Sequence, residues 1–275
     1  MKIYTLNVGQ GQLVVVVGSN EAIIVDTSVP LSPAHPIINV KAALADILNA
    51  KNLIGLMITG FDSDHFNEVG VKIVLNKYRP NWIMYPKYFK ETKTANAGFA
   101  AIKEFEKQKE ITKYSISLSD NNSRYYNTLS DDFYFEMFSP HKEDMNSSNN
   151  CSLVCKITEK STKATYLVTG DTENERWNRI TEIFGNSIKC DVLDAPHHGS
   201  KNGITKAAIK LMKPNTVLIS AGVDNSYGHP DKEALTIFNE VAENVYCTNG
   251  SKEKSGQSIE TEITKTGIKS VKYIA

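Results

Sequence analysis

The sequence of 275 residues lacks several features that would assign a protein to a class at once. It has only four cysteines and no Cys-x-x-Cys pair, so buried free thiols in a reducing compartment are the favoured interpretation. It has no surplus of either charge, because 31 basic residues match 31 acidic ones. No overall field therefore draws the protein to nucleic acid or to an anionic membrane, and any such binding needs a local patch.

Long apolar runs are also absent. The longest, Leu13–Val17, is far too short to cross a bilayer, and the N-terminus has neither the apolar stretch nor the small-residue cleavage site of a signal peptide. We therefore expect a soluble, cytoplasmic protein without membrane contact. Hydrophobic residues still make up 41% of the chain, which is enough for a sizeable core. Because no low-complexity tract or clear linker interrupts it, we predict one domain over residues 1–275.

Short β-rich runs open each half of the chain, and alternating strands and helices follow. The expected strands are residues 2–8, 13–17, 22–25, 53–58, 82–85, 153–158, 165–169, 190–193 and 216–220. The expected helices are residues 40–48, 68–78, 98–109, 173–184, 204–212 and 232–241. Residues 121–132 and 144–150 are expected to be polar loops. This order predicts an α/β protein, a four-layer αββα sandwich in which two mixed sheets pack face to face with helices outside.

Six side chains that can bind a cation lie where expected strands run out into loops. They are Asp62, Asp64, His65, Asp171, His197 and His229. Carboxylate oxygen and imidazole nitrogen are ligands of zinc and manganese, and catalytic sites keep one position open for water. Each residue alone has an ordinary explanation, such as Asp62 or Asp171 capping the helix that follows. Their joint occurrence at strand ends indicates a metal site built from distant parts of the chain.

Seven segments resemble the metallo-β-lactamase fold superfamily, and within it most of all the soluble hydrolase domain of ComEC-type DNA-uptake proteins and its stand-alone relatives. The segments are Leu6–Gly11, Ile24–Thr27, Thr59–His65, Asn150–Val154, Leu167–Glu173, Ala195–Ser200 and Ser226–Pro230. The last three are specific, since they carry Gly-Asp-Thr-Glu, Pro-His-His-Gly-Ser and Tyr-Gly-His-Pro. The resemblance covers nearly the whole chain.

This resemblance implies the αββα sandwich with one or two divalent ions at the sheet edge, zinc or manganese or else magnesium. It also implies hydrolysis of an ester-like or phosphodiester bond by metal-activated hydroxide. Asp171 would bridge the two metals, and Asp64 and His65 would hold the second of them. His229 would be a ligand or would bind the scissile group. The implied catalytic residues are thus Asp64, Asp171 and His229.

Three further residues receive roles from the same resemblance. Of the histidine pair, His197 would be the ligand and His198 its neighbour. Asp26 would orient a ligand histidine by accepting its ring N–H.

The loop that begins at Thr59 departs from the family pattern Thr-His-x-His-x-Asp-His. Gly60 and Asp62 stand where the family has two histidines that hold the first metal. The site could hold one metal through Asp64, His65, Asp171 and a later histidine, or two metals with Asp62 and water in place of imidazole, or its first position could be lost together with catalysis. We expect a metal site, because Asp62 is still a donor. More carboxylate and less imidazole favours manganese or magnesium over zinc.

The substrate is less well marked than the metal site. Two lysine groups could contact phosphates, one at Lys206, Lys210 and Lys213 and one at Lys87, Lys90 and Lys93, although solvated lysine faces are common. Aromatic side chains at Tyr85, Tyr88, Phe89, Tyr125 and Tyr126 could stack on bases or belong to the core.

These patterns favour a phosphodiesterase or nuclease acting on a nucleic acid or nucleotide. The alternative is a degenerate family member that binds without catalysis, as a regulatory subunit or with a protein partner from a neighbouring gene. A hydrolase of lactams, thioesters or small esters has no specific support in the sequence.

Overall fold

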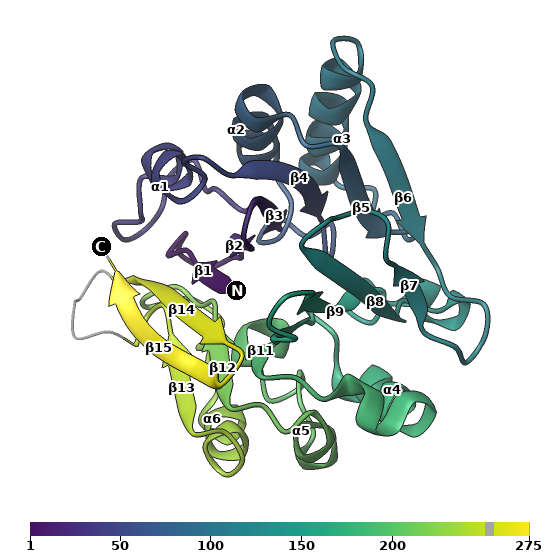
Figure 1. The fold of residues 1–275 in the computed structure, drawn as a ribbon, viewed down its shortest axis with the longest axis vertical. Coiled ribbons are helices and arrows are strands. Elements are labelled where there is room, and N and C mark those ends of the chain that lie inside the picture. Colours follow the sequence, from purple (N-terminus) through teal and green to yellow (C-terminus); the bar gives the residue numbers. More distant parts are fainter. Residues whose placement is uncertain (251–255, 275) are drawn as a thin grey trace.

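The computed structural model describes residues 1–250 and 256–274, and the strands form two sheets (Figure 1). The first sheet has the order β15 (Gly267–Ile274), β14 (Ser258–Thr264), β1 (Lys2–Thr5), β2 (Val14–Val17), β3 (Glu21–Val25), β4 (Asn52–Met57), β5 (Trp82–Pro86), β6 (Thr112–Ile116). The second has the order β13 (Asn244–Cys247), β12 (Thr216–Ile219), β11 (Val192–Asp194), β10 (Thr165–Val168), β9 (Val154–Glu159), β8 (Phe133–Ser139), β7 (Arg124–Tyr126). Both sheets are mixed, because parallel and antiparallel pairs occur in each.

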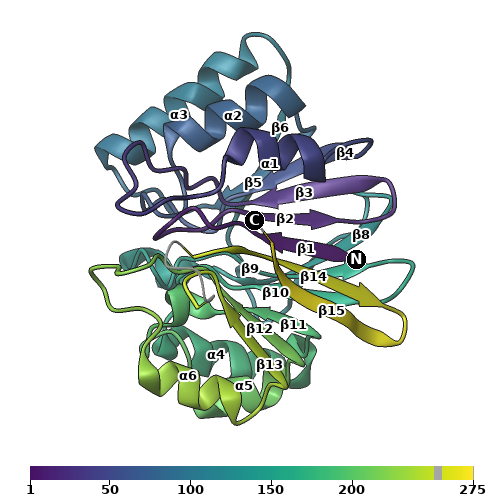
Figure 2. The same ribbon diagram turned by 90° about the vertical axis from the view of Figure 1, so that its left-hand side faces the viewer.

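Helices cover the outer face of each sheet (Figure 2). On the first sheet lie α1 (Val40–Ile47), α2 (Glu68–Tyr78) and α3 (Lys93–Glu106), and on the second lie α4 (Asn174–Phe184), α5 (Lys206–Met212) and α6 (Lys232–Asn239). The described part of the chain also has three short 3₁₀ turns, η1 (Lys142–Asn146), η2 (Gly185–Ile188) and η3 (Pro196–Gly199). The predicted αββα sandwich is confirmed.

Strand β2 shows why two layers of core are needed. Its side chains alternate between the faces of the sheet, as in any strand. Val14 and Val16 belong to the apolar core between the two sheets, whereas Val15 and Val17 belong to the core under α1–α3. All four valine side chains are buried. An unbroken apolar run of this kind is stable only in a strand that is covered on both faces.

The middle of the chain differs from the prediction. Residues expected to form a polar loop include β7, a three-residue strand at the edge of the second sheet. Strands β6 and β8 were not predicted either. Strand β8 is buried along most of its length, but its aromatic run follows no simple alternation. Strand β7 is held by backbone pairing with β8 rather than by apolar side chains. Helix α3 begins at Lys93, five residues earlier than expected, because the Thr92 hydroxyl caps it.

The strand ends determine where the polar loops meet. Strands β3, β4 and β5 are parallel in one sheet, and β10, β11 and β12 are parallel in the other. Loops after the carboxyl ends of parallel strands gather at one edge. The loops after β4, β10, β11 and β12 carry all six predicted metal ligands, and Asp26 follows β3 directly. Within residues 1–250 and 256–274, no helix is long and apolar enough to cross a membrane.

Candidate metal centre

The loop after β4 is fixed by backbone hydrogen bonds before any cation is considered. The amides of His65 and Phe66 donate to the Asp62 carbonyl at 3.0 and 2.9 Å, which closes a tight turn. The carbonyls of Asp64 and His65 accept from Gln12 and Thr27, each at 2.7 Å. These bonds set the backbone of Asp64 and His65 against two neighbouring segments, so both side chains leave the turn in defined directions.

Asp171 and the histidine pair reach the same place from the second sheet. Gly170 has a φ of +51°, and a Cβ added there would lie 2.8 Å from the Thr59 Cβ, so only glycine lets this turn approach the β4 loop so closely. Beyond it, the Asp171 amide donates to the Ser152 hydroxyl at 3.0 Å. His197 and His198 both adopt left-handed backbone conformations, with φ of 51° and 54°. The strained turn points their two rings to different sides.

Four side chains form a compact, largely buried group. One ligand atom from each of Asp64, His65, Asp171 and His198 lies within 4.8 Å of the others. The His65 Nε2 is 2.9 Å from an Asp171 oxygen. The His198 Nε2 lies 3.6 Å from an oxygen of Asp64 and 3.6 Å from an oxygen of Asp171, which is too long for a hydrogen bond. This buried nitrogen has no hydrogen-bond partner within the described part of the chain, and two carboxylates face it. The donors therefore fit one divalent cation.

The outer nitrogen of each imidazole is held by an acceptor, as ligand histidines usually are. The His65 Nδ1 lies 2.7 Å from an oxygen of Asp26, which itself accepts from the Thr59 amide at 2.7 Å and the Thr59 hydroxyl at 2.6 Å. Asp26 is thus placed as expected. The His198 Nδ1 donates to the Ser220 carbonyl at 2.7 Å. These bonds leave both Nε2 atoms turned toward Asp171.

Three of the six predicted ligands lie outside this group. The places of the two adjacent histidines are the reverse of those predicted. His198 joins the group, whereas His197 turns outward and its Nδ1 lies 3.5 Å from Glu173. The physical reason is the left-handed backbone at both residues together with the bond from His198 to Ser220. His229 packs edge-on against His197, with ring centroids 5.7 Å apart. Asp62 forms an ion pair with Lys90 instead.

Asp194, the last residue of β11, was not among the predicted site residues. It is buried, and it accepts a hydrogen bond from the Gln12 side chain at 2.6 Å. Burial raises its pKa to about 7, although the Gln12 bond works in the opposite direction. The signal was available, since Asp194 ends an apolar strand as the other carboxylates do.

Charge and burial work against each other in the group. Burial lowers the pKa of His65, but the carboxylates of Asp171 and Asp26 raise it well above the ordinary value of 6.5. The same balance raises the pKa of His198, with Asp171 as the largest raising influence. Burial raises the pKa of Asp171 and of Asp64, but the neighbouring imidazoles more than offset this and lower both. The group thus pairs ionised carboxylates with protonated imidazoles, and a bound cation would displace the imidazole protons.

Cation binding is expected to strengthen as the pH rises, because metal-bound imidazole must give up its proton. Both histidine pKa values are raised, so each ring still holds its proton at pH 6.5 and releases it only at higher pH. We expect Mn²⁺ affinity to rise by up to about 10-fold per pH unit for each proton displaced, and one to two protons to be released near pH 6.5. Titration calorimetry in buffers of different ionisation enthalpy measures this number. An affinity that does not change between pH 6 and 8 would contradict the assignment of His65 and His198.

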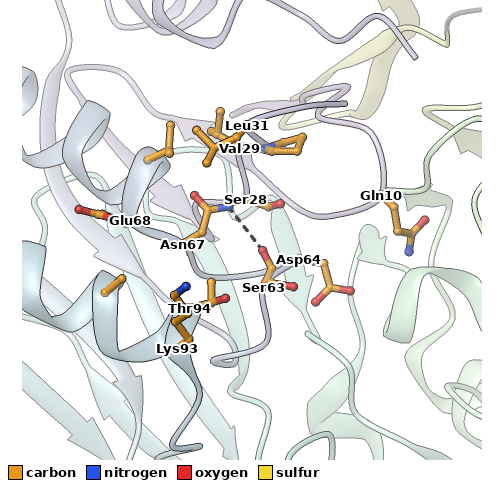
Figure 3. A pocket seen from close by; sticks show the side chains of 13 residues that line it. Gln10, Ser28, Val29, Leu31, Ser63, Asp64, Asn67, Glu68, Lys93 and Thr94 are labelled. Atoms are coloured by element: carbon orange, nitrogen blue, oxygen red, sulfur yellow. Dashed lines mark hydrogen bonds between the residues drawn. The ribbon is translucent and has the colours of Figure 1, made fainter. Parts of the chain in front are cut away.

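A cavity of about 430 Å³ opens beside Asp64 (Figure 3). Val29 and Leu31 form an apolar wall, and Ser63 and Asp64 lie on the other side. The first turns of α2 and α3 complete the lining, and Lys93 is the one cation among the described residues that line it. The Ser28 side chain also lines the cavity; it is buried, and its hydroxyl has no hydrogen bond to any described residue. The cavity therefore joins apolar surface to unused polar groups next to the candidate cation site, as ligand pockets commonly do.

Comparison with known proteins agrees with this geometry. Residues 6–223 match the metallo-beta-lactamase superfamily. The chain is 29% identical over 247 residues to ComE operon protein 3 of Bacillus subtilis (strain 168), which covers 85% of this chain and 30% of that protein. A stretch of 98 residues, 35% of this chain, is 32% identical to Recombination protein 2 of Haemophilus influenzae (strain ATCC 51907 / DSM 11121 / KW20 / Rd) and covers 12% of it. The chain thus spans less than a third of the length of either curated relative.

Among solved structures, similar architecture is found in Igni18, a metallo hydrolase from the hyperthermophilic archaeon Ignicoccus hospitalis KIN4/I. The TM-score is 0.53 at 14% identity, and the match covers 96% of this chain and 100% of that one. At this identity the likeness extends to the fold alone.

Proposed function

The chain belongs to the metallo-beta-lactamase superfamily, and from this premise we propose that it is a metal-dependent hydrolase that cleaves a phosphodiester bond in a nucleotide or nucleic acid. One observation carries the proposal: the donors of Asp64, His65, Asp171 and His198 converge within 4.8 Å at the edge of the sandwich. Two carboxylates and two imidazoles suit zinc or manganese, and magnesium less well. A divalent ion held there supplies the activation of water and the polarisation of a phosphoryl oxygen.

The residues around the group position the reactants. Asp26 and the Ser220 carbonyl hold the two imidazole rings in place, so little reorganisation is needed when a substrate arrives. His229 lies at the rim with the ring of Tyr227 stacked on it at 5.8 Å. Burial and the neighbouring His197 lower the pKa of His229, which keeps it neutral at pH 7. A neutral imidazole there can donate one hydrogen bond to the scissile group.

The cavity beside Asp64 supports a nucleotide as the substrate. Its volume of about 430 Å³ and its apolar wall suit a base or sugar, while Lys93 and the Ser28 hydroxyl suit polar edges or phosphate. Of the two predicted lysine groups, the one in the middle of the chain contributes Lys93 to the lining of this cavity, whereas Lys87 and Lys90 do not line it. Lys206, Lys210 and Lys213 do not line the cavity, and Lys206 pairs with Glu240 at 2.5 Å.

Hydrolysis of bis(p-nitrophenyl) phosphate and of oligonucleotides in the presence of Mn²⁺ tests the proposal. We expect a metal-dependent rate that Asp171→Asn lowers by about 1,000-fold or more, because that change removes roughly 4 kcal/mol of stabilisation of the transition state. Glu104→Gln, which removes an exposed carboxylate on α3, should leave the rate unchanged. Mn²⁺-loaded protein that turns over no phosphodiester would count against the proposed chemistry.

A second candidate follows from the altered loop. Gly60 offers no ligand, and Asp62 is engaged by Lys90, so fewer donors are free than in a site for two metals. These features favour a member that binds a nucleotide or partner without cleaving it. Metal analysis of the purified protein separates the two: less than about 0.1 divalent ion per chain after incubation with excess Mn²⁺ would favour the binding protein.

A further inference from the structure

The ion pair between Lys90 and Asp62 lies beside the candidate metal centre. Asp62 is two residues before Asp64 in the same turn, and Lys90 is in the loop between β5 and α3. Within residues 1–250 and 256–274, Asp64, His65, Asp171 and His198 form the only group with the geometry of a metal site, and Asp62 is not part of it. The positive charge that lies next to Asp62 is therefore the Lys90 ammonium.

Aromatic packing holds this ion pair in place. Phe61, adjacent to Asp62, is buried against Phe89, adjacent to Lys90, with ring centroids 5.8 Å apart. Phe61 also contacts Phe99 of α3 at 5.1 Å. These ring contacts join the loop after β4 to the segment between β5 and α3. Asp62 and Lys90 therefore meet because the aromatic residues next to them are packed together. An ion pair between two flexible surface side chains would lack this support.

The Lys90 ammonium can also bind a further hydrogen-bond acceptor. Its ammonium has three N–H donors, and Asp62 is its sole partner within the described residues. The Lys90 side chain is 36% exposed. Asp62 and, more weakly, Asp64 raise its pKa, so the ammonium stays charged at every physiological pH. A Cβ added at Gly60 would meet nothing within 4 Å, which leaves open space on the same loop.

The local charge explains why such a cation is needed. Asp64 and Asp171 together carry two negative charges, which a single divalent ion only balances. A phosphodiester substrate is an anion, and additional positive charge at the site would favour its binding. The lysine supplies that charge from a fixed position without requiring further protein ligands.

We propose that this chain holds a single divalent ion and that the Lys90 ammonium, anchored by Asp62, binds an anionic oxygen of the substrate beside that ion. Lys90 thus supplies the positive charge that a second metal ion would otherwise supply. This inference rests on the proposed function for the identity of the anion. Asp62 is a positioning residue in it.

Two measurements test the inference without any turnover. The first is metal content after incubation with excess Mn²⁺ and gel filtration, for which we expect one ion per chain. The second is calorimetric binding of adenosine 5′-monophosphate to the Mn²⁺-loaded protein. Lys90→Ala should weaken this binding by about 10- to 100-fold, the range for losing a hydrogen bond to a charged group, while metal content stays at one.

A control variant separates a local contact of Lys90 with the nucleotide from a general effect of positive charge. Lys87→Ala removes the same charge from an exposed side chain three residues earlier and should change nucleotide binding by less than about 2-fold. Two ions per wild-type chain would overturn the inference, and so would equal nucleotide affinity in the wild type and Lys90→Ala. Because both readouts are equilibrium measurements, they stand even if the protein turns over no phosphodiester, so failure of the proposed function and failure of this inference are distinguishable.

Discussion

Replacing His198 by alanine is expected to weaken metal binding severely, whereas the same change at His197 should leave it nearly intact. The His198 Nε2 faces carboxylate oxygens of Asp64 and Asp171 at 3.6 Å, and its loss removes one of the four donors. Loss of an outer-shell partner alone costs about 10- to 100-fold in metal affinity, so loss of a direct ligand should cost at least about 100-fold. Titration calorimetry with Mn²⁺ measures the difference, and the rate of the proposed phosphodiester hydrolysis should fall with it.

The two variants are closely matched. Both residues have left-handed backbone conformations, so alanine strains the turn about equally in each. His197 is partly exposed, and its Nδ1 lies 3.5 Å from Glu173 rather than in the group. Circular dichroism should confirm that both variants fold. If His197→Ala lost the metal and His198→Ala kept it, the order first predicted from the sequence would be correct and the geometry described above would be wrong.

The second large effect concerns Gly70 in the first turn of α2. A Cβ added there would lie 1.9 Å from the carbonyl oxygen of Thr27, which is backbone and cannot rotate away. Gly70→Ala would force α2 away from the segment that carries Asp26 and the amide bonded to the His65 carbonyl. We expect a loss of about 3 kcal/mol or more in the free energy of unfolding, as for severe overpacking. Thermal unfolding should show a fall of roughly 6–12 °C.

Gly60 is the matched control for this steric argument. A Cβ at that position would meet nothing within 4 Å, and its φ lies outside the left-handed region. Gly60→Ala should therefore change the free energy of unfolding by less than about 1 kcal/mol, with a slight gain from the less flexible unfolded chain. Equal stability of the Gly70→Ala and wild-type proteins would mean that α2 and the Thr27 turn do not pack as described.

The sequence predicted much of the architecture because buried strands and amphipathic helices leave distinct apolar patterns. The run Val14–Val17 and the strand that precedes Asp62 are continuous apolar segments, and such segments are stable only between layers. The pattern failed at β7, where Arg124 and Tyr125 are exposed. Edge strands of this kind depend on backbone hydrogen bonds to a neighbour, and a neighbour cannot be read from local composition.

The chemistry of the site was likewise present in the sequence, since Asp64, His65 and Asp171 all follow strand ends and the structure brings them together. What the chain order could not decide was which ring of an adjacent pair turns inward. That choice depends on two left-handed residues and on the Ser220 carbonyl, which lies on another strand end. Motif spacing gives no information on ring direction.

The sequence by itself determined the layered fold and the kinds of donor available, because burial patterns and side-chain chemistry are local properties of the chain. Only the tertiary structure decided that His198 and not His197 meets the carboxylates, and that Lys90 and not a second group of ligands faces Asp62. These contacts join segments from different loops, 28 residues apart for Lys90 and Asp62 and far more for His198 and Asp64. Packing between layers sets such distances, and no local pattern encodes them.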